Sequence, residues 1–137
     1  MCLALAKMIV QDAEGATKFI EIRVRGVQNG TEAKKLAFSV ANSNLFKCAM
    51  FGNDPNWGRI AAALGSVTSH LRWEKLDIIL NNRAVFKNGK PCTILDNKFL
   101  KKRLVVVEID LHLGKAGQTV YTSDLSYDYV RINADYN

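Results

Sequence analysis

The chain has 137 residues, of which 48% are hydrophobic and 23% are charged, a length and composition typical of one folded domain and not of a disordered chain. Its net charge is +6, but the basic residues are scattered and form one triple run, at 101–103, so a nucleic-acid partner is not expected. No apolar stretch approaches the roughly 20 residues that a membrane-spanning helix needs, so a membrane partner is not expected either.

The first dozen residues favour a helix, because Leu5, Met8 and Ile9 recur at three- and four-residue steps. We expect this helix to bury that apolar stripe. Apolar and charged residues then alternate from 20 to 25, a pattern that indicates a strand with one solvent-facing side, closed by Gly26.

Two helices are expected after this strand. Thr31 is the predicted N-cap of the first helix, whose core-facing residues are Leu36, Ala37, Val40 and Ala41. The polar residues 42–44 interrupt it, and 45–51 continue as a shorter helix.

The segment FGNDPNWGR predicts a loop that leads into a further helix through 60–64. Asp54 suits the N-cap position of that helix, and Pro55 suits its first turn. Trp57 and Arg59 would then provide either a stacking surface with a carboxylate clamp, or a buried aromatic ring with an ion-paired arginine.

The second half of the chain is typical of antiparallel strands. Segments 76–80 and 84–86 form an expected hairpin around Asn81–Asn82, and the strongest strand pattern runs from 105 to 113. Residues 120–129 return as a strand or as a strand followed by a short helix. The whole pattern predicts an α+β fold, a single domain over 1–137, with a mixed or mainly antiparallel sheet packed with helices.

The cysteines and histidines give no sign of a metal site. Cys2, Cys48 and Cys92 are far apart, and His70 and His112 are isolated. Motifs for nucleotides, dinucleotides and serine hydrolases are absent from the sequence. We therefore expect no metal and no resident cofactor.

Three segments combine polar residues with glycine or proline: DAEGATKF, FGNDPNWGR and YTSDLSYDYVRINADYN. In the first, Glu14 suits an ammonium ligand, or is simply exposed after a helix that Gly15 closes. In the third, Asp124, Asp128 and Asp135 are either paired carboxylates for acid–base or metal chemistry, or a polar strand face.

Three longer stretches, AKMIVQDAEGATKFIEIRV, VANSNLFKCAMFGNDPNWGRI and SDLSYDYVRINADY, resemble the bifunctional glutamate N-acetyltransferase/ornithine acetyltransferase (ArgJ) family of arginine biosynthesis. The resemblance covers nearly the whole chain and implies the C-terminal part of a β chain in the larger DmpA/ArgJ-like fold. The family moves acetyl from N-acetylornithine to glutamate, and in some members from acetyl-CoA, through an acetyl-threonine intermediate.

The resemblance also implies how this chain takes part. The family's nucleophilic threonine has no match here, so the chain should carry no catalytic residue and be inactive alone. Glu14 matches a glutamate that binds the substrate's amino group, and Asn133 matches an asparagine that binds its carboxylate. The family's final substrate-binding Thr or Ser has no counterpart up to Asn137, and the DPNWGR segment is expected to be structural.

The implied partners are the α chain and the remainder of the β chain, in an assembly of two α and two β chains. The implied ligands are N-acetylornithine, ornithine and glutamate, and in some members of the family acetyl-CoA is a co-substrate as well. The implied compartment is the cytoplasm, or a mitochondrion or plastid in a eukaryote. The alternative is a stand-alone amino-acid-binding module derived from the enzyme.

Overall fold

The structure is a computed structural model that describes residues 2–135. The α-helices are α1 (Cys2–Gln11), α2 (Gly30–Ala41), α3 (Asn44–Phe51), α4 (Trp57–Val67) and α5 (Tyr127–Ala134). The strands are β1 (Phe19–Val27), β2 (Asp77–Leu80), β3 (Arg83–Lys87), β4 (Lys90–Pro91), β5 (Leu104–Asp110) and β6 (Ala116–Ser123). Short 3-10 helices are η1 (Trp73–Lys75) and η2 (Lys98–Leu100).

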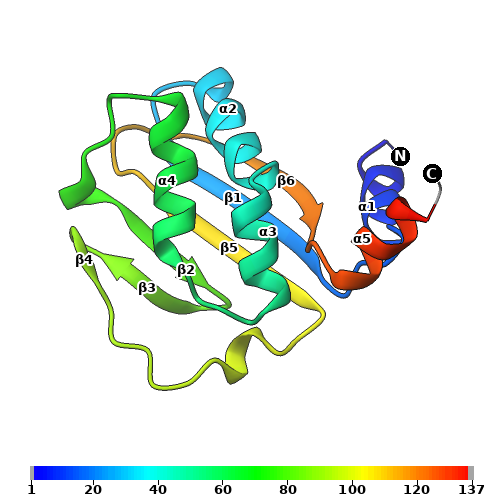
Figure 1. The fold of residues 1–137 in the computed structure, drawn as a ribbon. Coiled ribbons are helices and arrows are strands. Elements are labelled where there is room, and N and C mark those ends of the chain that lie inside the picture. Colours follow the sequence, from blue (N-terminus) through cyan, green and yellow to red (C-terminus); the bar gives the residue numbers. More distant parts are fainter. Residues whose placement is uncertain (1, 136–137) are drawn as a thin grey trace.

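The strands form one mixed sheet in the order β4-β3-β2-β5-β1-β6. The β1 and β5 strands are parallel, and every other neighbouring pair is antiparallel. Helices α2, α3 and α4 cover one face of this sheet (Figure 1). The predicted α+β class with a mixed, mainly antiparallel sheet is confirmed.

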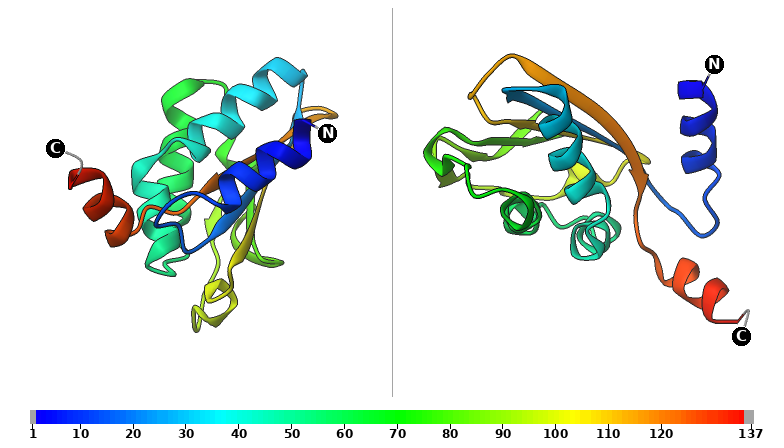
Figure 2. Two further views of the ribbon diagram at one scale, coloured as in Figure 1. Left: turned by 90° about the vertical axis from the view of Figure 1, so that its right-hand side faces the viewer. Right: turned by 90° about the horizontal axis from the view of Figure 1, so that it is seen from above.

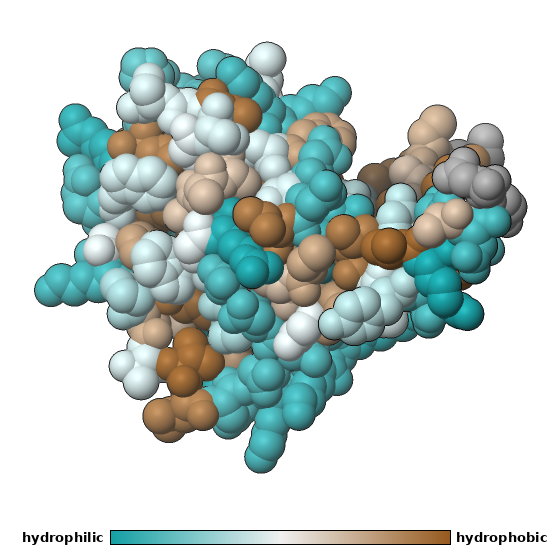
Figure 3. Space-filling model, in the orientation of Figure 1, coloured by the Kyte–Doolittle hydropathy of each residue, from teal (hydrophilic) through white to brown (hydrophobic). Residues whose placement is uncertain are grey.

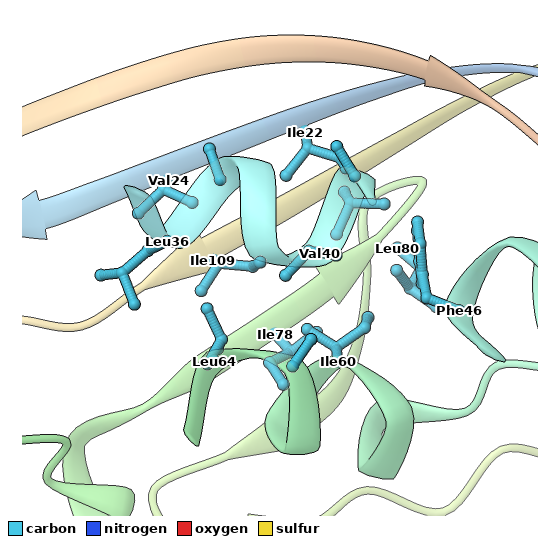
Figure 4. Packing of buried hydrophobic residues seen from close by; sticks show 14 of the residues in the cluster. Ile22, Val24, Leu36, Val40, Phe46, Ile60, Leu64, Ile78, Leu80 and Ile109 are labelled. Carbon is cyan, nitrogen blue, oxygen red and sulfur yellow. The ribbon is translucent and has the colours of Figure 1, made fainter. Parts of the chain in front are cut away.

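The core lies between that sheet face and the three covering helices. Alternate residues of β1, such as Ile22 and Val24, point toward Leu36 and Val40 of α2, and Ile109 of β5 lies beside them (Figure 4). All five are at most 1% exposed. Burying such a side chain contributes about 1.5–3 kcal/mol, so the period-two pattern of the sequence decides which face of the sheet is covered.

Helices α1 and α5 lie outside this core and project from one end of the sheet (Figures 1 and 2). Helix α1 forms where it was predicted, but none of its residues is buried. Leu5, Met8 and Ile9 are 53%, 54% and 74% exposed, so the predicted burial of this stripe is wrong for the described residues. Hydrophobic residues also reach the surface where the body meets the projecting helices (Figure 3).

Two predicted helix caps are wrong by two residues. Asn29, and not Thr31, caps α2, since its side chain accepts a hydrogen bond from the Glu32 N–H at 2.8 Å. Asn56, and not Asp54, caps α4. Asp54 belongs instead to the end of α3, because its backbone N–H donates to the carbonyl of Ala49 in that helix at 2.9 Å.

The second half of the chain follows the predicted order of elements. Asn81 and Asn82 have φ values of 46° and 65°, as the tight turn between β2 and β3 requires. The strand predicted over 105–113 ends earlier, at Asp110, because His112 turns the chain at φ 52°. Segment 120–129 is a strand followed by a helix. Among residues 2–135, no helix has the length and apolar character to cross a membrane.

Candidate functional site

The first and third polar segments meet at a buried carboxylate. Asp124 is 1% exposed and accepts hydrogen bonds from the backbone N–H groups of Thr17 and Lys18, at 2.8 and 2.9 Å. The Thr17 hydroxyl donates to its second carboxylate oxygen. Hydrogen bonds to a charged acceptor are stronger than neutral ones, so Asp124 fixes the start of β1 against the end of β6.

A second contact between these segments holds α5. The Ser126 hydroxyl donates to the carbonyl of Gly15 and accepts from the Tyr129 N–H at 3.0 Å, which caps the helix. Gly15 has a φ of 77°, and a Cβ atom there would lie 2.6 Å from the Tyr129 nitrogen. Gly15 does not cap α1, which ends at Gln11; it allows the loop and α5 to approach closely.

Substituting Gly15→Ala should lower the free energy of unfolding by about 1–3 kcal/mol, because a side chain with a positive φ is strained and would displace the start of α5. Urea denaturation followed by circular dichroism measures this difference. Gly30→Ala is the matched control, because a Cβ at Gly30 meets no atom within 4 Å. Equal stability of the two variants would contradict the prediction.

Lys18 connects the first segment to the second. Its side-chain ammonium donates to Asn53 Oδ1 at 2.7 Å and to the carbonyls of Leu100 and Lys102, and the residue is 7% exposed. Burial lowers the pKa of Lys18, and the negative charge of Asp124 partly opposes that shift. All three polar segments therefore meet around one buried lysine and one buried aspartate.

Lys18 was not singled out from the sequence, although a signal was present. The core-facing residues of β1 are Ile20, Ile22 and Val24, and position 18 lies two residues before them in the same alternation. A lysine on the covered side of a strand needs partners for its ammonium. The oxygen atoms that supply them belong to residues 35, 82 and 84 positions away in the sequence, and the sequence pattern does not reveal these contacts.

The two predicted substrate-binding residues lie on the segments that this framework joins. Glu14 is exposed on the turn between α1 and β1, and no group within residues 2–135 forms a hydrogen bond or ion pair with its carboxylate. Asn133 is exposed on α5, where its side-chain amide donates to the carbonyl of Tyr129 at 2.8 Å. The contact of Gly15 with Tyr129 brings the two segments together, whereas the binding roles of both residues remain predictions.

The other aspartates of the third segment do not join Asp124. Asp128 is exposed and lies 3.4 Å from Arg131 on the same helix, and Asp135 is exposed after the end of α5. In the described part of the chain, no group of three or more His, Cys, Asp or Glu residues is placed to hold a metal ion. Tyr136 and Asn137, which end the third segment, lie outside the described residues.

Packing accounts for the second segment. Trp57 is partly buried and its ring lies 4.6 Å from that of Phe86. Arg59 donates to the carbonyl of Leu45 at 2.7 Å, and within residues 2–135 it forms no ion pair, so of the two readings only the buried aromatic ring is seen. The same segment supplies Asn53, whose φ of 54° turns the chain so that its amide oxygen meets Lys18.

The fold and the site define an α+β domain with a polar framework at the sheet end from which α1 and α5 project. The model of the ArgJ family matches residues 1–137. The chain belongs to the ArgJ family, as the resemblance of the three segments implies.

Individual relatives agree with this assignment. The chain is 46% identical to the arginine biosynthesis bifunctional protein ArgJ of Geobacter sulfurreducens, over 98% of this chain and 35% of the relative. It is 45% identical to the protein of the same name from Bacillus anthracis, over 99% of this chain and 34% of the relative. The chain thus spans about a third of the length of these curated relatives.

A solved structure confirms the fold. The crystal structure of arginine biosynthesis bifunctional protein ArgJ from Bacillus halodurans superposes with a TM-score of 0.92 at 37% identity. The match covers 98% of this chain and 65% of that chain. The six-stranded sheet and its helices are therefore part of a larger ArgJ fold, as expected from the sequence.

Proposed function

We propose that this chain is the C-terminal part of the β chain of an arginine-biosynthesis acetyltransferase and supplies residues that bind the substrate. The proposed reaction moves acetyl from N-acetylornithine to glutamate, with acetyl-CoA as a further donor. The observation that carries the proposal is the joining of all three family-like segments around Lys18 and Asp124. This shared framework gives one structural reason for three polar segments that lie far apart in the sequence.

Glu14 and Asn133 take complementary roles in this proposal. The exposed carboxylate of Glu14 is free of partners among residues 2–135 and suits the cationic amino group of ornithine or the ammonium of glutamate. The amide of Asn133 donates to a carboxylate, after it releases the carbonyl of Tyr129. The two side chains together recognise an amino acid by its two charged groups.

The nucleophile of the reaction comes from outside this chain. Acetyl passes through a threonine at the start of the β chain, and the donors that stabilise the oxyanion come from the α chain. The exposed apolar side chains of α1, Leu3, Leu5, Met8 and Ile9, support a partner, because such patches mark surfaces that other chains cover. The proposed assembly contains two α and two β chains.

Substituting Glu14→Ala in the complete enzyme should lower kcat/KM for N-acetylornithine by about 10- to 150-fold, the loss of one hydrogen-bonded charge worth about 1.5–3 kcal/mol. The assay mixes this chain with a partner that supplies the α chain and the start of β, and measures acetyl transfer to glutamate. Self-cleavage of the precursor should be unaffected.

Glu74→Ala is the matched control, since Glu74 is an exposed carboxylate on η1, in a different part of the chain. Unchanged transfer in Glu14→Ala would refute the role of Glu14. If instead the isolated chain binds ornithine while it neither associates with the partner nor restores transfer, it is a separate amino-acid-binding module.

A further inference from the structure

A basic hollow lies beside the candidate site. It has a volume of about 420 Å³, and four of its lining residues are Lys18, Lys101, Lys102 and Arg103, with the ring of Phe51 on its wall. The triple basic run at 101–103 is exposed to solvent, as its polar character predicts. The structure places it against the buried lysine that joins the polar segments.

The cations of this hollow differ in how they are held. Lys18 is fixed by its three oxygen partners, and Arg103 donates to the carbonyl of Gln11 at 2.9 Å. The ammonium groups of Lys101 and Lys102 form no hydrogen bond or ion pair with any group in residues 2–135, and no Asp or Glu in that range lines the hollow. Lys101 and Lys102 can thus turn toward a ligand in the hollow, Arg103 is held beside them, and Lys18 lies beneath with its donors occupied.

We infer that this hollow binds the phosphate groups of a phosphorylated ligand and, because the inference rests on the proposed acetyl transfer, that the ligand is the acyl-CoA donor. Lysine ammonium groups bind phosphate as compact point charges. Lys18 has its three N–H donors occupied and interacts with the charge of Asp124, so the exposed cations are Lys101, Lys102 and Arg103. Three such cations exceed what one carboxylate of an amino-acid substrate needs, whereas they match a polyanion. The volume is more than ten times the roughly 30 Å³ that one water occupies in the liquid, enough for phosphate groups.

Titration calorimetry of this chain with inorganic pyrophosphate at low ionic strength tests the phosphate site. Substituting Lys101→Ala together with Lys102→Ala should weaken binding by at least about tenfold, because both adjustable ammonium groups and their charge-assisted contacts are lost. The control pair Lys87→Ala and Lys90→Ala removes the same charge from the exposed β3–β4 hairpin and should bind like the parent chain. No binding by the parent, or equal weakening in both pairs, would overturn the site.

Kinetics of the complete enzyme test the identity of the ligand. In the Lys101→Ala/Lys102→Ala variant, KM for acetyl-CoA should rise about tenfold relative to KM for N-acetylornithine, which carries no phosphate. An equal change for both donors, or no use of acetyl-CoA by an enzyme whose chain binds pyrophosphate, would overturn the assignment to the acyl donor. Failure of transfer from N-acetylornithine in the parent enzyme would refute the proposed function itself, while the pyrophosphate titration would still decide the phosphate site.

Discussion

Replacing Asp124 with alanine is expected to lower the free energy of unfolding by about 3–5 kcal/mol, as for removal of one member of a buried charged network. The substitution leaves the backbone N–H groups of Thr17 and Lys18 without their acceptor. It also removes the negative charge that favours the ammonium form of Lys18. Both the start of β1 and the connection to α5 would lose their anchor.

Urea denaturation of this chain measures the loss, and Asp128→Ala is the matched control. Asp128 is an aspartate four residues away with a side chain 66% exposed, so its removal should change stability by no more than about 0.5 kcal/mol. Asp124→Asn keeps the shape and one acceptor oxygen and should fall between the two. An Asp124→Ala variant as stable as Asp128→Ala would show that the hydrogen bonds of Asp124 contribute little.

Replacing Lys18 with methionine is the second large change, with an expected loss of about 2–4 kcal/mol at neutral pH. Methionine has a similar length, but it leaves the carbonyls of Leu100 and Lys102 and the side-chain oxygen of Asn53 without their donor. Lys98→Met, in η2, is the control, because Lys98 is exposed. Equal stability of the two variants would contradict the prediction.

The effect of Lys18 should also depend on pH. Burial lowers its pKa below 10.5, the ordinary value for lysine, which the unfolded chain retains. Between the lowered pKa and 10.5 the unfolded state binds more protons than the folded state, so the contribution of Lys18 to stability rises with pH in that window. The difference in unfolding free energy between the parent chain and Lys18→Met should therefore be larger near pH 10.5 than at neutral pH, and a constant difference would contradict the lowered pKa.

Local patterns predicted the elements well, because alternation and turn residues act over a few positions. The strand from residue 20 and the Asn81–Asn82 turn follow directly from the sequence. The caps were harder, since Asn29 and Thr31 both qualify chemically and only the extended backbone of Asn29 decides between them. The apolar stripe of α1 predicts a face that needs covering, but not which chain covers it.

The candidate site was only partly predictable, because its framework joins distant residues. The segments that resemble the ArgJ family indicated Glu14 and Asn133, and the binding roles of both residues remain predictions. From the sequence, Asp124 suited either acid–base or metal chemistry or a polar strand face. In the structure it is a buried acceptor of three hydrogen bonds. Lys18 was not predicted, because its oxygen partners are far from it in the sequence and only the fold brings them together.

The position of β1 in the sheet affects how the chain folds during synthesis. This strand lies between β5 and β6, so both of its neighbours are made after β2, β3 and β4, and its start is fixed by Asp124, 107 residues after Thr17. A nascent chain that has emerged only through β4 exposes both edges of β1 without a partner strand. Pairings of such long range form slowly, and we expect the growing chain to depend on chaperones until β6 has left the ribosome.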